Sequence, residues 1–142
     1  MYFFDEPVSA QMQDLPLADL FRFLPFGYLL TILIETPVLL AGLPSRLTLR
    51  QKLFCGVWLT ACTYPVVALV LPAVFFGAPR WQYLAVAEIF APAAECMLFW
   101  IAFKGRIERR ELVQSFVAIT IANLASFGLG EVLNHFRWFG LF

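Results

Sequence analysis

The sequence is poor in charged residues and in the side chains that usually hold metals or haem. Asp, Glu, Lys and Arg make up only 14% of the 142 residues, against roughly 25% in soluble domains. The single histidine cannot supply both imidazole ligands of a b-type haem, and the three cysteines form no C-x-x-C pair. The formal net charge is zero and no basic stripe is present, so we expect no nucleic-acid partner. No glycine-rich phosphate loop is present either, and we expect no catalytic function.

What is abundant is apolar sequence, which makes up 61% of the chain with a mean hydropathy of +0.79. Four apolar runs, each close to the roughly 20 residues that a helix needs to cross a bilayer, are separated by short connections. They cover residues 24–43, 53–76, 83–103 and 113–134. The sequence therefore predicts an all-α polytopic four-helix bundle in a membrane, with the lipid bilayer as its first partner.

The two ends of the chain fall outside these runs. Residues 1–23 are acidic and aromatic, and their last part has apolar residues at helical spacing. We expect either a short helix lying at the membrane interface or a tail that ends at Pro25. Residues 135–142 are expected to form a short tail.

The basic residues predict an orientation, because cytoplasmic loops retain Lys and Arg. The loops at 44–52 and 104–112 hold seven of the ten, and the opposite side holds three: Arg46, Arg50, Lys52, Lys104, Arg106, Arg109 and Arg110 against Arg22, Arg80 and Arg137. Both loops are therefore expected in the cytoplasm and both termini outside. In a bacterium the membrane would be the inner one.

The two halves of the chain show an internal repeat. A shift of 60 positions without a gap aligns polar residues that are rare in membrane helices: Glu35 with Glu95, Arg46 with Arg106, Arg50 with Arg110, Thr60 with Thr120 and Thr63 with Asn123. Both halves start outside and turn in the cytoplasm, which predicts two parallel-repeat hairpins related by an axis along the membrane normal.

Glutamates inside the apolar runs are the strongest functional signal, because a charge costs roughly 3 kcal/mol or more at the bilayer centre. By depth, Glu35 and Glu95 fall near the middle together with Thr63 and Asn123, whereas Glu88 and Glu131 lie nearer the outer side. No Lys or Arg lies within the four runs to neutralise these acids. Three interpretations stay open: protonated carboxyls that act as structural glue, a shared proton that is released in a transport cycle, or a bound cation.

A cation would find oxygen ligands at this depth, because carboxylates and the carbonyls freed by helix-interior prolines are hard donors. Glu35 and Glu95 are the candidate metal ligands. Glu131 and His135, four residues apart, form a weaker candidate pair with Glu88 as a third ligand. A single histidine near a span end is more often an interfacial residue. We expect no cofactor other than such a cation.

Small residues form a continuous ridge on the fourth run, at Ala118, Ala122, Ser126 and Gly130. Ridges of this kind allow helix backbones to approach closely, either within a bundle or between partners. Because so small a chain encloses little cavity by itself, we expect a homo-oligomer or a larger membrane complex.

Four short motifs carry a resemblance to small bacterial four-span integral membrane proteins of uncharacterised function. They are E-T-P at 35–37, T-Y-P at 63–65, the two glutamates of E-x6-E at 88–95, and N-L-A-S-F-G at 123–128. The resemblance covers the four runs and implies no activity. Small multidrug exporters also have four spans and a glutamate in the first, but their other motifs are missing here.

The resulting functional hypothesis is a small membrane protein with an intramembrane carboxylate site that binds protons or a cation, acting as a transporter or channel component. The alternative is a non-catalytic structural or assembly subunit whose small-residue ridges dock partner helices.

Overall fold

The described part of this computed structural model covers residues 17–135, with side chains for 24–133, and it is all helical. Helix α2 spans Leu17–Gly42, α5 spans Arg80–Phe103 and α6 spans Arg109–His135. Between α2 and α5 one continuous helical path consists of α3 (Leu49–Pro65), the π-helical segment η1 (Val66–Val70) and α4 (Leu71–Val74). Four helical stretches are thus long and apolar enough to cross a membrane. The prediction of four apolar helices is confirmed.

The helices begin earlier than the apolar runs. Residues 17–23, expected to belong to a separate interfacial helix or to a tail, are instead the first turns of α2, and Pro25 lies inside that helix. Helix α3 begins at Leu49 because Thr48 and Gln51 form a capping box that satisfies the first N–H groups. Hydropathy does not locate these helix starts, because the first turn of a helix can contain polar residues. Residues 1–16 and 136–142 lie outside the described part.

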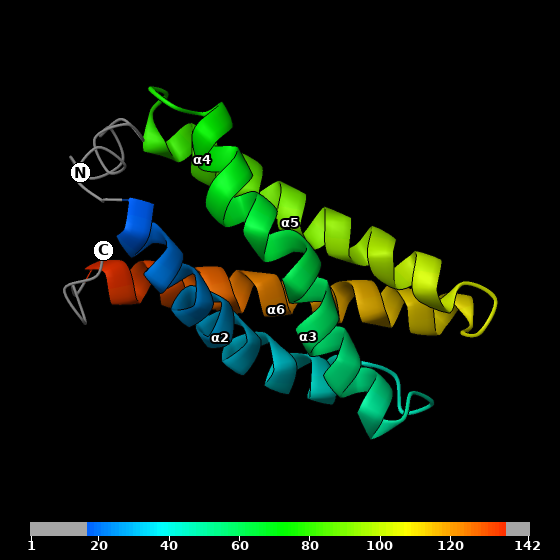
Figure 1. Cartoon of the computed structure of the whole chain (residues 1–142). Helices are drawn as coiled ribbons and strands as arrows, with labels where there is room; N and C mark the ends of the chain where they lie inside the picture. Colours follow the sequence, from blue (N-terminus) through cyan, green and yellow to red (C-terminus); the bar gives the residue numbers. More distant parts are fainter. Residues whose placement is uncertain (1–16, 136–142) are drawn as a thin grey trace.

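The helices form two antiparallel hairpins, α2 with α3–α4 and α5 with α6, that lie side by side (Figure 1). Helix α2 packs against both α3 and α6, and α5 also packs against α3 and α6, so α2 and α5 lie diagonally opposite each other. The turns at 43–48 and 104–108 meet at one end, which we call the basic end. The turn at 75–79 lies at the opposite end. Side chains from the diagonal helices α2 and α5 can therefore meet at the bundle axis.

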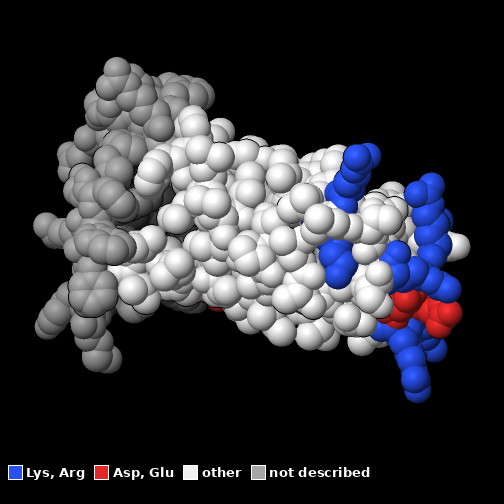
Figure 2. Space-filling view, turned by 90° about the horizontal axis from the view of Figure 1, so that it is seen from below, with Lys and Arg blue, Asp and Glu red and all other residues white. Residues whose placement is uncertain are grey.

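Polarity is inverted relative to a soluble bundle. Large apolar side chains such as Leu33 (70% exposed) and Ile89 (72%) cover the outside, while Glu35 and Glu95 are each only 2% exposed. Lys and Arg gather towards the basic end, and the middle of the visible surface carries none (Figure 2). An apolar belt around a buried polar centre is the arrangement expected of a protein that lies in lipid.

The apolar core fills the half of the bundle that leads to the basic end. Phe99 stacks on Phe103 with ring centroids 4.7 Å apart, and Leu39, Leu59 and Ile119 are almost completely buried around them. Helices α2 and α6 approach closely at Gly42, where an added Cβ would lie 2.7 Å from the Cβ of Ala118. Buried apolar side chains therefore lie between the bundle centre and the basic end.

Candidate functional site

Glu35 lies at the bundle centre, held by hydroxyls of two neighbouring helices. The Thr60 hydroxyl on α3 donates to its Oε2 at 2.8 Å, and the Ser126 hydroxyl on α6 donates to its Oε1 at 2.7 Å. The Glu35 side chain thereby links α3 and α6, the two helices that pack against α2.

Glu95 is held in the same manner from α5. The Thr63 hydroxyl on α3 donates to its Oε1 at 2.7 Å, and the side-chain amide of Asn123 on α6 donates to its Oε2 at 2.7 Å. Each glutamate therefore accepts one hydrogen bond from α3 and one from α6. We call the six residues the central polar cluster: Glu35, Thr60, Thr63, Glu95, Asn123 and Ser126.

The cluster contains two acids and no base. Among the residues that the structure describes, ion pairs involve only Arg46 with Glu108 and Glu111 and Arg80 with Glu131, so neither Glu35 nor Glu95 has a cationic partner. Both carboxyls are 2% exposed, so water screens them little, and a buried charge without a partner is costly. Protons are the simplest means of balancing this charge.

The three hydroxyls have two acceptors each. Besides its glutamate, Thr60 reaches the carbonyl of Gly56 at 2.8 Å, Thr63 that of Leu59 at 3.1 Å, and Ser126 that of Asn123 at 3.0 Å. A hydroxyl has one proton, so it donates either to an ionised carboxylate or to the backbone, and in the latter case its oxygen can accept a hydrogen bond from the O–H of the carboxylic acid. The hydrogen bonding is thus complete in both protonation states.

Asn123 makes the two oxygens of Glu95 unequal. Its amide donates simultaneously to Oε2 of Glu95 and to the carbonyl of Ile119, at 2.7 and 3.0 Å. Oε2 is therefore kept as an acceptor, and a proton on Glu95 belongs on Oε1, facing Thr63.

The cluster does not resemble a metal site. Within the described residues no group of three His, Cys, Asp or Glu side chains is placed to hold a metal ion. All four carboxyl oxygens of the cluster already accept hydrogen bonds from protein donors, so a metal would have to displace them. The donor set fits protons better than a cation.

The outer acids lie apart from the cluster. Glu131 forms a two-point ion pair with Arg80 at 2.7 and 3.2 Å, which joins the start of α5 to the end of α6. The expectation that no basic residue reaches the acids of the spans is therefore wrong for Glu131, because α5 begins three residues before the apolar run and includes Arg80.

Glu88, two turns from Glu95, makes no hydrogen bond to the described residues. The side chain of His135 lies outside the described part.

The small-residue ridge of α6 has several environments. Ala118 and Ala122 are buried at 5% and 1% exposure, and Ser126 belongs to the central polar cluster. At Gly130 an added Cβ would meet nothing within 4 Å. Close helix packing therefore involves the half of the ridge nearer the basic end.

The structure brings together the four residues placed at this depth from sequence, but the pairing differs from a simple two-fold arrangement. Exact two-fold symmetry would pair Thr63 and Asn123 with different glutamates. Both bind Glu95, and Glu35 instead uses Thr60 and Ser126, each three residues from those positions along its helix. Thr60 and Ser126 were not among the candidate ligands, although their helical spacing from Thr63 and Asn123 placed them on the same faces.

Comparisons of the chain with models of protein families, with curated proteins and with solved structures found no match.

Proposed function

We propose that this chain is a small integral membrane protein that binds protons at the central polar cluster and acts as a component of proton-coupled transport. The observation that supports this most is the position of Thr60, Thr63 and Ser126, each between a carboxyl oxygen and a backbone carbonyl. A proton can therefore enter or leave without leaving a buried group unsatisfied, which would cost about 1–3 kcal/mol.

Access to the cluster is proposed from the end opposite the basic loops. The apolar core around Phe99 and Phe103 closes the other route. Ser126 is the least buried member of the cluster and donates directly to Glu35, so it is the proposed point of proton entry. Under this proposal the protein would be closed on the basic side of the cluster and would exchange protons on the other side, as one state of an alternating-access cycle does.

The orientation belongs to the same proposal. With the basic end in the cytoplasm, the closed side of the bundle faces inwards and the side near Ser126 faces outwards. In a bacterium this outer side is the one from which protons flow down their gradient.

The alternative function as an assembly subunit requires a free ridge for partner helices. Half of the proposed ridge is already covered, because Ala118 and Ala122 pack inside this bundle. The hydrogen-bonded glutamates would serve as structural glue under that alternative, and their protonation state would stay constant. The two functions therefore differ in proton exchange rather than in the static contacts.

The test is proton flux into liposomes that contain a pH-sensitive dye and the purified full-length protein. We expect wild type to admit protons under an imposed gradient, and Glu35→Gln and Glu95→Gln each to lower the rate at least about tenfold, since proton carriers in membranes depend on their acids. Glu108→Gln is the matched control, because Glu108 is exposed at the basic end and contacts only Arg46 among the ion pairs described.

Infrared spectroscopy separates loss of the site from loss of the fold. A carbonyl band of a protonated carboxyl should change with pH in wild type and Glu108→Gln and be absent in the double variant of Glu35 and Glu95. Equal flux in all variants, with helical circular dichroism unchanged, would remove the transport proposal in favour of a structural role.

A further inference from the structure

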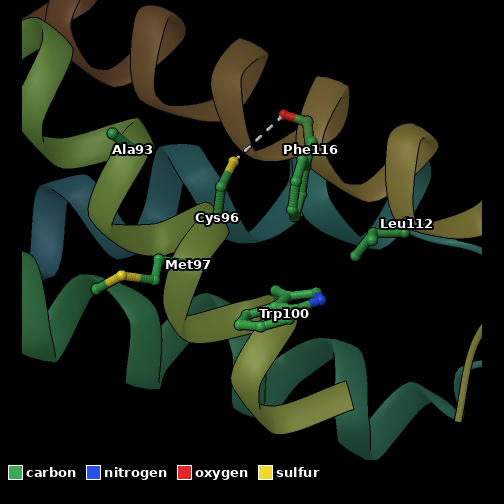
Figure 3. A pocket seen from close by; sticks show the side chains of 6 residues that line it. All are labelled: Ala93, Cys96, Met97, Trp100, Leu112 and Phe116. Carbon is green, nitrogen blue, oxygen red and sulfur yellow. Dashed lines mark hydrogen bonds between the residues drawn. The ribbon is translucent and has the colours of Figure 1, made fainter. Parts of the chain in front are cut away.

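An open apolar pocket lies on the outer surface between α5 and α6, on the side of the basic end and away from the central polar cluster. Its volume is about 380 Å³, within the range of small-ligand sites. Its lining comes from two helices: Ala93, Cys96, Met97 and Trp100 on α5, with Leu112 and Phe116 on α6 (Figure 3).

The walls of the pocket are suited to a hydrocarbon chain. The only polar contact among the lining side chains is the Cys96 thiol, whose Sγ lies 3.8 Å from the Phe116 carbonyl. That carbonyl also accepts a hydrogen bond from Thr120, so the pocket offers no unsatisfied acceptor there. Met97 and Trp100 are 56% and 44% exposed, which leaves the pocket open to the surrounding membrane.

Positive charge adjoins the pocket at its end nearest the loops. The Lys104 ammonium lies 5.1 Å from the ring centroid of Trp100, which is itself a wall of the pocket. Arg106, Arg109 and Arg110 follow within the next six residues, and they form no ion pair with the described residues. The nearby acids Glu108 and Glu111 are both engaged by Arg46.

The Trp100 indole provides a second polar group at this boundary. Its nitrogen lies on the side of the pocket where Leu112 projects from the start of α6 (Figure 3). It donates no hydrogen bond to the residues that the structure describes, so it is available to a phosphate or glycerol oxygen. Tryptophan at the level of the headgroups commonly has this role.

We infer that the pocket between α5 and α6 binds an anionic phospholipid, with one acyl chain against Cys96, Met97 and Phe116 and the phosphate beside Lys104 and Trp100. Apolar walls at acyl-chain depth, next to cations that form no ion pair with the described residues, complement this class of lipid in both charge and polarity. The inference is independent of the central polar cluster and of its protonation.

The experiment uses quenching of tryptophan fluorescence by phospholipids with brominated acyl chains. A full-length variant with Trp58→Phe, Trp81→Phe and Trp138→Phe retains Trp100 as its single fluorophore. It is reconstituted in phosphatidylcholine vesicles that contain a fixed fraction of brominated phosphatidylglycerol or of brominated phosphatidylcholine. We expect stronger quenching of Trp100 by the anionic lipid at equal bromine content. A variant that retains only Trp81, at the opposite end, should show no preference.

Charge and pocket variants then locate the site. Lys104→Gln should lower the preference for the anionic lipid about fivefold, the factor expected for one cation near an anionic surface. Arg50→Gln removes an exposed cation from the other hairpin at the same end and should leave the preference unchanged. Ala93→Phe fills the pocket and should reduce quenching of Trp100, whereas Ala61→Phe, on exposed α3 surface, should not.

Three results would overturn the inference. Equal quenching of Trp100 by the two lipids would show no selectivity, and a preference that survives Lys104→Gln would place the phosphate elsewhere. Protection of Trp100 from both lipids would show that protein rather than lipid covers the pocket. Circular dichroism of each variant verifies that the helices have formed.

Discussion

At the scale of single residues, the distance between α2 and α3 next to the central polar cluster is set by one glycine. A Cβ added to Gly56 would lie 2.5 Å from Oγ1 of Thr36, 3.1 Å from its Cβ and 3.2 Å from its Cα. The last of these is a backbone atom and cannot rotate away. Because Thr36 follows Glu35 directly, this contact also determines where the glutamate meets Thr60.

Gly56→Ala should therefore destabilise the protein by about 1–3 kcal/mol, the usual cost of overpacking a close contact. Gly128→Ala is the matched control, because a Cβ at Gly128 meets nothing within 4 Å and alanine is the better helix former by up to about 1 kcal/mol. Unfolding of the purified protein in detergent, followed by helical circular dichroism, measures both. Equal stability of the two variants would contradict the close approach.

The acids of the site could be predicted from sequence, but not all of their partners. Glu35 and Glu95 are conspicuous because carboxyls are rare in apolar runs. Thr60 and Ser126 are not conspicuous, because a hydroxyl that bonds to its own helix is common in membrane spans. Which hydroxyl meets which acid depends on helix rotation by less than one turn, and a single sequence does not contain that information.

At the scale of helices, the end of α2 is completed by residues from two other helices. The carbonyl of Leu40 lacks its usual donor because residue 44 is a proline. Lys52 Nζ on α3 donates to that carbonyl at 3.1 Å and to the carbonyl of Leu43 at 2.7 Å. Gln114 of α6 donates to the carbonyl of Gly42 at 2.9 Å. Capping of α2 thus fastens three helices together at the basic end.

Lys52→Met should lower the free energy of unfolding by about 1.5–3 kcal/mol, because it keeps the length of the side chain but removes a charged donor from two carbonyls. Arg50→Met removes a cation two residues away that is exposed and makes none of these bonds, and it should change stability by less than about 0.5 kcal/mol. Denaturation of both variants in the same detergent provides the comparison. A similar loss in both would indicate a general charge effect instead of capping.

Helix identity was more predictable than helix bounds. The apolar runs identify all four spans, because a helix that crosses the bilayer needs about 20 predominantly apolar residues in succession. Their polar first turns, at Arg50 to Lys52 and at Arg109 to Glu111, are helical for local reasons that hydropathy does not contain. The π-helical segment at Val66–Val70 was not predicted either. It follows Pro65, and one of its carbonyls, that of Val67, accepts a hydrogen bond from Tyr83 of α5 at 3.1 Å.

At the scale of the whole molecule, the two ends of the bundle differ in both charge and packing. Seven of the ten basic residues belong to the two loop regions of the basic end, and the buried apolar core lies between them and the central polar cluster. The charge bias is the basis of the proposed orientation, and the position of the apolar core is the basis of the proposed side of proton access. The proposed orientation and the proposed proton access are consequently linked, and a test of the first constrains the second.

The orientation predicts opposite labelling of two single cysteines in a background with Cys55→Ala, Cys62→Ala and Cys96→Ala. Ser45→Cys, in the exposed turn of the basic end, should resist a membrane-impermeant maleimide in intact cells and react after permeabilisation. Phe76→Cys, in the turn at the other end where Phe76 is 58% exposed, should react in intact cells. The reverse pattern would place Ser126 on the cytoplasmic side and reverse the proposed direction of proton entry. Reaction of both sites in intact cells would indicate insertion in two orientations, which a bias of seven basic residues against three disfavours.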